Sequence, residues 1–173
     1  MKTGIHFRPA SQEDDSFLCQ VFASTRERLL ASLPFDAAQK EAFARQQHLC
    51  QDSHYRRQYP HAAFEIVCSG DERIGRLYVN RTREEILIID IALLPEYRGA
   101  GIGRELLESL LAEGAETGRT VSLHVDKSNP ALRLYQRLGF QIVQDAGADW
   151  QMEWRAGARS SAEPALVGTG LLK

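Results

Sequence analysis

Apolar residues gather most densely near the middle of this 173-residue chain, in the run Ile86-Leu87-Ile88-Ile89-Asp90-Ile91-Ala92-Leu93-Leu94. Isoleucine dominates the run, and Pro95 behind it cannot donate into a sheet ladder. The pattern therefore predicts a buried strand that ends at about Leu94. A glycine-rich turn follows, and leucines then recur at helical spacing. The predicted helix has one apolar face, made by Leu106, Leu107, Leu110, Leu111 and Ala115.

The rest of the chain alternates between strand and helix periodicity. Period-two or β-rich runs predict strands at residues 5–9, 63–68, 73–80, 120–125, 140–144 and 149–154. An apolar stripe predicts a helical region that starts with a capping box at Ser11 and Asp14 and ends at Pro34. A second helix, capped by Asp36, is predicted over about 37–55. Strand 120–125 should run parallel to the central strand, because a helix crosses between them.

A short helix is predicted before the last two strands. Asn129 is expected to cap it, Pro130 to take its first position, where proline is best tolerated, and Gly139 to end it. The predicted order of the whole chain is β-α-α-β-β-β-α-β-α-β-β. No internal repeat interrupts it.

Length and charge narrow the class of protein. A chain of 173 residues suits one compact domain, which we expect over residues 1–155, with a flexible or surface-packed tail over 156–173. The formal net charge is −2 and the basic residues are scattered, so a nucleic-acid partner is not expected. No apolar run approaches the roughly 20 residues of a membrane span, and residues 1–9 do not resemble a signal peptide. We therefore expect a cytoplasmic protein without a membrane partner.

The three cysteines, Cys19, Cys50 and Cys68, are widely spaced and form no Cys-x-x-Cys pair. This spacing argues for reduced thiols rather than a disulfide framework or a metal site. We expect them to be small buried residues. No metal site is predicted.

The turn Arg98-Gly99-Ala100-Gly101-Ile102-Gly103 lies between the central strand and its helix. The first N–H groups of a helix lack internal partners and sit at the positive end of the macrodipole, and glycines before them allow an anion to approach. A phosphate or pyrophosphate is the expected ligand; a tight connection that binds nothing is the alternative. The turn lacks the Gly-Lys-Ser/Thr of a Walker loop and the Gly-x-Gly-x-x-Gly of a dinucleotide site.

Arg-Gly-x-Gly-Ile-Gly after a strand ending Ile-Ala-Leu-x-Pro resembles the central acetyl-CoA motif of the GNAT superfamily of N-acetyltransferases. A second similarity lies in residues 125–140, where Asn129 is followed by an alanine, Leu134-Tyr135 and Gly139-Phe140. The resemblance covers about residues 5–155. It implies the GNAT fold, of the α/β (α+β) class, with a mixed central sheet of six to seven strands flanked by about four helices.

The resemblance also implies acetyl-CoA as co-substrate. Main-chain amides would hold its pyrophosphate at Arg98, Gly99, Ala100, Gly101, Ile102, Gly103 and Arg104. The main chain of Ile91, Ala92 and Leu93 would pair with the pantetheine arm like an added strand and polarise the thioester carbonyl. Asn129 would contact coenzyme A. Tyr135 would protonate the departing thiolate; its alternative role is that of a core aromatic residue.

Three residues are candidates for the base that deprotonates the acceptor amine: His124, Asp90 and Glu85. All three lie on the two strands that this superfamily splays apart. Histidine takes up a proton near neutral pH, and a carboxylate such as Asp90 inside an apolar run needs a partner or a function. Each of the three could instead be a satisfied structural group, and water could serve as the base.

The predicted function is transfer of an acetyl group from acetyl-CoA to the primary amine of a small molecule or peptide, by direct attack without an acyl-enzyme. The acceptor should contact the first two helices and the segment 55–61. Two alternatives remain: an acyltransferase that uses another acyl-CoA, and a coenzyme A-binding sensor or interaction module without turnover. A homodimer is common in the superfamily and is possible here.

Overall fold

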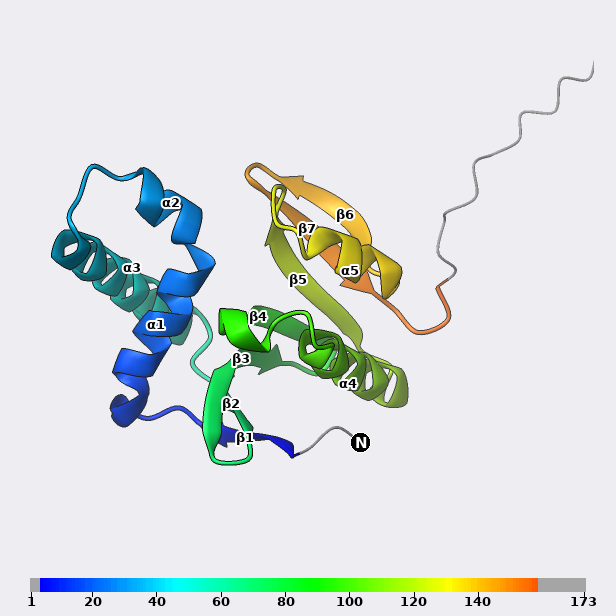
Figure 1. The fold of residues 1–173 in the computed structure, drawn as a ribbon. Coiled ribbons are helices and arrows are strands. Elements are labelled where there is room, and N and C mark those ends of the chain that lie inside the picture. Colours follow the sequence, from blue (N-terminus) through cyan, green and yellow to red (C-terminus); the bar gives the residue numbers. More distant parts are fainter. Residues whose placement is uncertain (1–3, 159–173) are drawn as a thin grey trace, which may run out of the picture.

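The computed structural model describes residues 4–158, which form a seven-stranded sheet and five α-helices (Figure 1). The predicted tail, 156–173, lies outside the described residues from position 159 onward. The elements are, in chain order, β1 Ile5–Pro9, η1 Gln12–Asp14, α1 Asp15–Thr25, α2 Glu27–Ser32, α3 Ala37–Gln58, β2 Ala63–Ser69, β3 Glu72–Arg81, β4 Glu85–Leu93, η2 Pro95–Tyr97, α4 Ile102–Thr117, β5 Thr120–Asp126, α5 Leu132–Arg137, β6 Gln141–Ala146 and β7 Asp149–Trp154.

The sheet has the order β1-β2-β3-β4-β5-β7-β6, and only the central pair, β4 and β5, is parallel. All other neighbours are antiparallel. The predicted mixed sheet and the parallel crossover through the helix after the glycine turn are confirmed.

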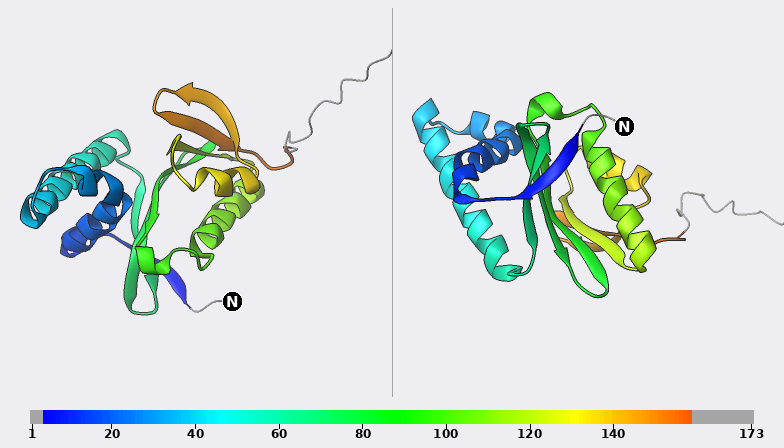
Figure 2. Two further views of the ribbon diagram at one scale, coloured as in Figure 1. Left: turned by 45° about the horizontal axis from the view of Figure 1, so that its top comes forward. Right: turned by 90° about the horizontal axis from the view of Figure 1, so that it is seen from below.

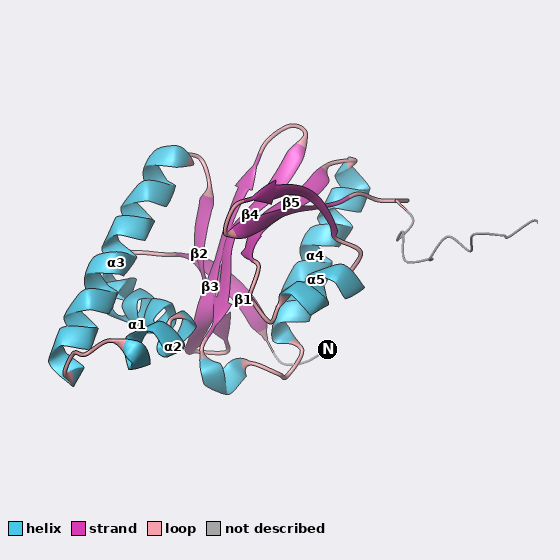
Figure 3. Ribbon diagram, turned by 90° about the horizontal axis from the view of Figure 1, so that it is seen from above, coloured by secondary structure: helices cyan, strands magenta, loops and turns pink. Residues whose placement is uncertain are grey.

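Helices cover both faces of the sheet: α1, α2 and α3 lie on one face, and α4 and α5 on the other (Figures 2 and 3). Each face has its own apolar core. The larger core joins α4 and α5 to the strands, and the smaller one joins α1 to β2, β3 and β4. Helices α4 and α1 pack against opposite faces of β4, so this strand contributes to both cores.

The predicted buried face of α4 is confirmed for its four leucines and wrong for Ala115, which is exposed. Gly114 is buried instead. A Cβ at this position would lie 2.7 Å from the Val121 side chain, so the helix packs too closely on β5 for any larger residue. The close approach explains why the glycine takes the inward position.

The first predicted helical region splits into α1 and α2 at Arg26, whose φ of −119° and ψ of 18° are not helical. The hydroxyls of Ser24 and Thr25 donate to the carbonyls of Val21 and Phe22, three residues back. Such bonds compete with the helix backbone and favour its termination. The split makes five α-helices where about four were expected.

Two smaller expectations need correction. The short helix α5 begins at Leu132, not at Pro130, because Asn129 and the following residues form a turn in which the Asn129 Oδ1 accepts from the Ala131 N–H. Only Cys68 is buried; Cys50 is exposed and Cys19 is intermediate. All three are free thiols.

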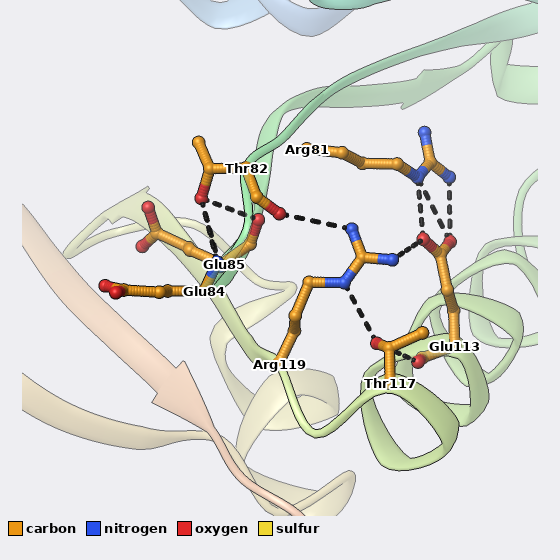
Figure 4. A network of polar contacts seen from close by, with 7 residues as sticks. All are labelled: Arg81, Thr82, Glu84, Glu85, Glu113, Thr117 and Arg119. Atoms are coloured by element: carbon orange, nitrogen blue, oxygen red, sulfur yellow. Dashed lines mark hydrogen bonds and ion pairs between the residues drawn. The ribbon is translucent and has the colours of Figure 1, made fainter.

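A network of hydrogen bonds and ion pairs lies at the end of the sheet where β4 and β5 pair (Figure 4). Glu113 of α4 accepts from Arg81 at 2.8 Å and from Arg119 at 3.3 Å. Arg119 also donates to the carbonyl of Thr82 in the β3–β4 turn. The bond from Arg81 holds the pKa of Glu113 below its ordinary value. The network joins α4 to the β3–β4 turn and to the α4–β5 connection, and so holds β4 and β5 together at this end of the sheet.

Asp14 is the most strongly held carboxylate near the N-terminus. Its side chain is 1% exposed and accepts from both Arg8, at 2.7 and 2.8 Å, and Arg73, at 3.1 Å. The Ser11 N–H donates to the same group, which confirms the predicted capping box. The bond from Arg8 holds the pKa of Asp14 well below its usual range.

Asp14→Asn should destabilise the protein at pH 7 by about 3 kcal/mol, the low end for breaking a buried ion pair because both arginines are partly exposed. The folded-state pKa is depressed, so this contribution is present above the unfolded-state pKa of about 4 and declines as the pH falls below it. Urea unfolding at pH 7 and pH 3 measures the difference. Asp71→Asn, in the exposed β2–β3 turn, is the control. An equal loss at both pH values would contradict the prediction.

No helix among residues 4–158 has the length and apolar character needed to cross a bilayer.

Candidate active site

The sheet opens between its two central strands. β4 and β5 pair only from Glu85 to Ile88 and from Thr120 to Leu123; beyond these residues β5 pairs with β7 alone. Figure 1 shows β5 leaving β4 toward β7 and β6. The second half of β4 therefore turns one main-chain edge toward the opening without a partner strand among the described residues.

The residues of β4 predicted to pair with a ligand fall into two groups. The Leu94 N–H donates to the Ile74 carbonyl on β3. Alternate residues of a strand direct their main-chain groups to the same side, so those of Ala92 also face β3. The main chains of Ile91 and Leu93 face the opening. The side chains of Ala92 and Leu93 are buried, as expected, and Ile91 is partly buried.

The glycine turn lies at the same opening, ahead of α4. Gly99 and Gly101 have left-handed φ angles of 74° and 86°, and a Cβ at either would meet nothing within 4 Å. These glycines are therefore required by the backbone conformation and leave open space beside the helix. The first backbone bond of α4 runs from the Glu105 N–H to the Gly101 carbonyl. The amides of residues 101–104 precede it, at the positive end of the dipole, and can bind an anion.

The side chains of the two arginines in this segment point to protein partners. Arg98 donates to the Leu93 carbonyl at 2.8 Å and to the Ser24 hydroxyl at 2.9 Å, so it links the turn to β4 and α1. Arg104 pairs with Glu108 along α4. Ile102 packs against the larger core, and Gly103 lies near Leu93. The anion-binding capacity of the turn is therefore mainly a property of its main chain.

Tyr135 of α5 packs in the larger core, on the other face of the sheet from Asp90. It is 7% exposed and its ring meets Phe140 edge-on. Burial raises the pKa of Tyr135 to about 12, and the negative charge of Asp90 adds to the rise. The phenol therefore keeps its proton at neutral pH and can donate it. Asn129 is exposed at the end of β5, with its side-chain oxygen bonded to the Ala131 N–H.

A β-bulge places Asp90 on the face covered by α3. Tyr78 of β3 pairs with Asp90 while Val79 pairs with Ile88, so Ile89 is the extra residue. Asp90 then meets Arg76, with 2.7 Å between Nη2 and Oδ2. Arg76 is 2% exposed and Asp90 16%. The buried guanidinium neutralises and orients a carboxylate that still reaches the opening.

Arg76 is held from α3 as well. Its Nη2 donates to Gln51 at 3.1 Å, and its Nη1 lies 3.4 Å from Nδ1 of His48. Since arginine can only donate, Nδ1 accepts and His48 is neutral. Burial lowers the pKa of His48, and the charge of Arg76 acts in the same direction. Sequence reasoning missed Arg76, His48 and Gln51; the signal for Arg76 was a single charge within the β-rich run 74–79.

The other two candidate bases lie on the same face of the sheet as Asp90. Val121, Leu123 and Val125 point into the larger core, so His124 points the opposite way, where it is exposed. Glu85 accepts from the Ser122 hydroxyl at 2.5 Å near the closed end. Five residues of strand, or about 16 Å, separate Glu85 from Asp90. The structure thus brings Asp90 and His124 to the rim of the opening and leaves Glu85 away from it.

Among the described residues, no group of three His, Cys, Asp or Glu side chains could hold a metal ion. The arrangement is an anion site at a helix terminus, a free strand edge with a carboxylate on the same strand, and a protonated phenol. It suits transfer of a group from a phosphate-bearing carrier.

Comparison with known proteins supports this interpretation. Residues 26–140 match the model of the acetyltransferase (GNAT) family. A [ribosomal protein bS18]-alanine N-acetyltransferase of Haemophilus influenzae is 38% identical over 78 residues, which are 44% of this chain and 53% of that protein. The chain thus matches about half the length of that relative.

Two solved structures share the fold at low identity. The PaiA N-acetyltransferase of Thermoplasma acidophilum, in complex with coenzyme A, is 21% identical with a TM-score of 0.65, over 88% of this chain and 99% of that chain. A GNAT family acetyltransferase of Elizabethkingia anophelis with acetyl-CoA bound is 16% identical with a TM-score of 0.55, over 89% and 99%. The predicted fold class is confirmed.

Proposed function

Since the chain belongs to the GNAT acetyltransferase family, we propose that it transfers an acetyl group from acetyl-CoA to the primary amine of a small molecule or peptide, in a ternary complex. One observation carries the proposal: the free edge of β4 and the left-handed glycines ahead of α4 lie at the same opening in the sheet. The ligands bound in the two similar solved structures, coenzyme A and acetyl-CoA, support the choice of co-substrate.

The residues present fit that co-substrate. The space beside Gly99 and Gly101 can admit a diphosphate, and the amides of residues 101–104 can bind it. The main chains of Ile91 and Leu93 can pair with a pantetheine arm, although the Leu93 carbonyl is shared with Arg98. When bound, acetyl-CoA supplies an activated acetyl group on a thiol leaving group.

The chain's own side chains then carry the proton transfers. Tyr135, protonated because it is buried, donates a proton to the departing thiolate. Asp90, fixed by Arg76, receives the acceptor ammonium. His124, on the opposite rim, removes its proton. We assign Glu85 a structural role, since its carboxylate already accepts from Ser122 at the closed end.

The experiment that tests the proposal measures free thiol released from acetyl-CoA across a panel of amines, together with acetyl-CoA affinity by calorimetry. The proposal predicts binding and amine-dependent release. Binding without release for any amine would instead favour a sensor module.

A further inference from the structure

A pocket of about 380 Å³ lies among α1, α2 and α3. Its walls include the apolar side chains of Phe22, Leu29 and Phe43, and its polar groups include Arg26 and Gln51. A few polar groups among apolar walls are typical of a small-molecule site, and the volume falls in the range of such sites.

The pocket is joined to Asp90 through one nitrogen atom. Gln51, which lines the pocket, accepts from Nη2 of Arg76 at 3.1 Å, and the same nitrogen donates to Asp90 at 2.7 Å. Arg76 is buried and cannot move without breaking both bonds. Arg76 and Asp90 do not line the pocket themselves, but the Arg76 guanidinium, which lies between Asp90 and the Gln51 side chain of the pocket wall, holds both in a fixed arrangement.

The charge of the pocket is positive. None of its lining residues is Asp or Glu. Arg26 is exposed, and within residues 4–158 its guanidinium has no salt bridge; it lies over the Phe22 ring, 5.7 Å from the ring centroid. A cation over an aromatic ring that forms no salt bridge can pair with an anionic ligand.

The charge of Arg26 acts on groups of two further elements. Hydrogen bonds from Ser128 lower the pKa of Asp126 at the end of β5, and the charge of Arg26 acts in the same direction. Burial raises the pKa of Tyr55 on α3 to about 12, and Arg26 opposes that rise. The Arg26 guanidinium thus interacts electrostatically with the end of β5 and with α3.

We propose that this pocket selects an acceptor that carries an amine, a carboxylate and an apolar side group, that is, a free amino acid with an apolar side chain. The inference rests on the acetyl transfer proposed above. The amine lies at Asp90, the carboxylate pairs with Arg26, and the apolar group fills the space between Phe22 and Phe43. An arginine guanidinium can donate two parallel hydrogen bonds to one carboxylate, which makes it a specific partner for this group.

The positive charge of Arg26 disfavours two other acceptor classes. With its first amine at Asp90, a polyamine would place its second cation beside Arg26, where the amino acid places its carboxylate. The terminus of a peptide has no carboxylate beside its amine, which would leave Arg26 without a partner. The experiment therefore includes one polyamine and one peptide, and a preference for either would be detected.

The test compares kcat/KM for L-phenylalanine with that for phenethylamine, which lacks only the carboxylate. The wild-type protein should prefer the acid by about tenfold or more, the worth of a hydrogen-bonded charge pair. Arg26→Gln should reduce that ratio about tenfold, and Arg26→Lys should restore part of it. Arg28→Gln, exposed two residues further on and outside the pocket lining, should leave the ratio unchanged.

Spermidine and a tetrapeptide that begins with alanine complete the panel. If either is the better acceptor and the ratio does not respond to Arg26→Gln, the amino-acid assignment is wrong, while the thiol release itself upholds the acetyl transfer. If no amine releases thiol and calorimetry detects no acetyl-CoA binding, the proposed function itself is overturned.

Discussion

Gly101→Val should lower acetyl-CoA affinity at least a hundredfold, because it removes two or more hydrogen bonds between main-chain amides and a charged diphosphate. Gly101 has a φ of 86°, which a β-branched residue rarely adopts, and its Cβ would enter the open space ahead of α4. The substitution would both close that space and turn the amides of α4 away. Isothermal titration calorimetry with acetyl-CoA measures the loss.

The matched control is Gly70→Val in the β2–β3 turn. Gly70 also has a left-handed φ, of 57°, and a Cβ there would likewise meet nothing within 4 Å. Both variants should therefore lose about 1–2 kcal/mol of stability through backbone strain. Only the Gly101 variant should lose affinity; an equal loss in both would show that strain alone is responsible.

The second large effect is expected for Tyr135→Phe, which keeps the buried ring and removes the proton donor. The value of kcat should fall by about 10²- to 10³-fold, within the range for loss of a general acid. The dissociation constant for acetyl-CoA should stay within about twofold, because one buried hydroxyl contributes little to an interaction made by main-chain amides. Steady-state kinetics and calorimetry separate the two quantities.

Tyr78→Phe is the control for the loss of a buried tyrosine hydroxyl that makes no hydrogen bond. Tyr78 is fully buried beside Asp90 and Arg76, but its hydroxyl lacks a hydrogen-bond partner among the described residues, so its removal leaves the Arg76–Asp90 ion pair intact. Its removal should leave kcat near the wild-type value. If Tyr135→Phe changed kcat and affinity in parallel, Tyr135 would be a packing residue and the acid would have to be sought elsewhere.

Several features that depend only on neighbouring residues, such as a strand end, a helix cap and a tight turn, were predicted correctly from the sequence. Pro95 marked the end of β4, Asp36 capped α3, and the glycines marked the turn before α4, because each rule concerns neighbouring residues. The helix after that turn forced a parallel strand. The central half of the fold followed from these few constraints.

What could not be predicted depends on contacts between distant segments. The bulge at Ile89 decides which face Asp90 takes, and a single-residue shift would have placed it in the opposite core. Its partner Arg76 lies 14 residues away in the sequence on β3, and Gln51, which also binds Arg76, comes from the helix α3. Ala115 was misassigned for a similar reason, because helical spacing could not reveal how closely Gly114 approaches Val121.

A crystal structure of the protein with acetyl-CoA tests the placement of the co-substrate directly. The diphosphate should lie within hydrogen-bond distance of the amides of residues 101–104, with the pantetheine arm along Ile91 and Leu93 and the thioester sulfur near the Tyr135 hydroxyl. Electron density for the ligand at any other surface, or side chains filling the opening between β4 and β5, would contradict this site.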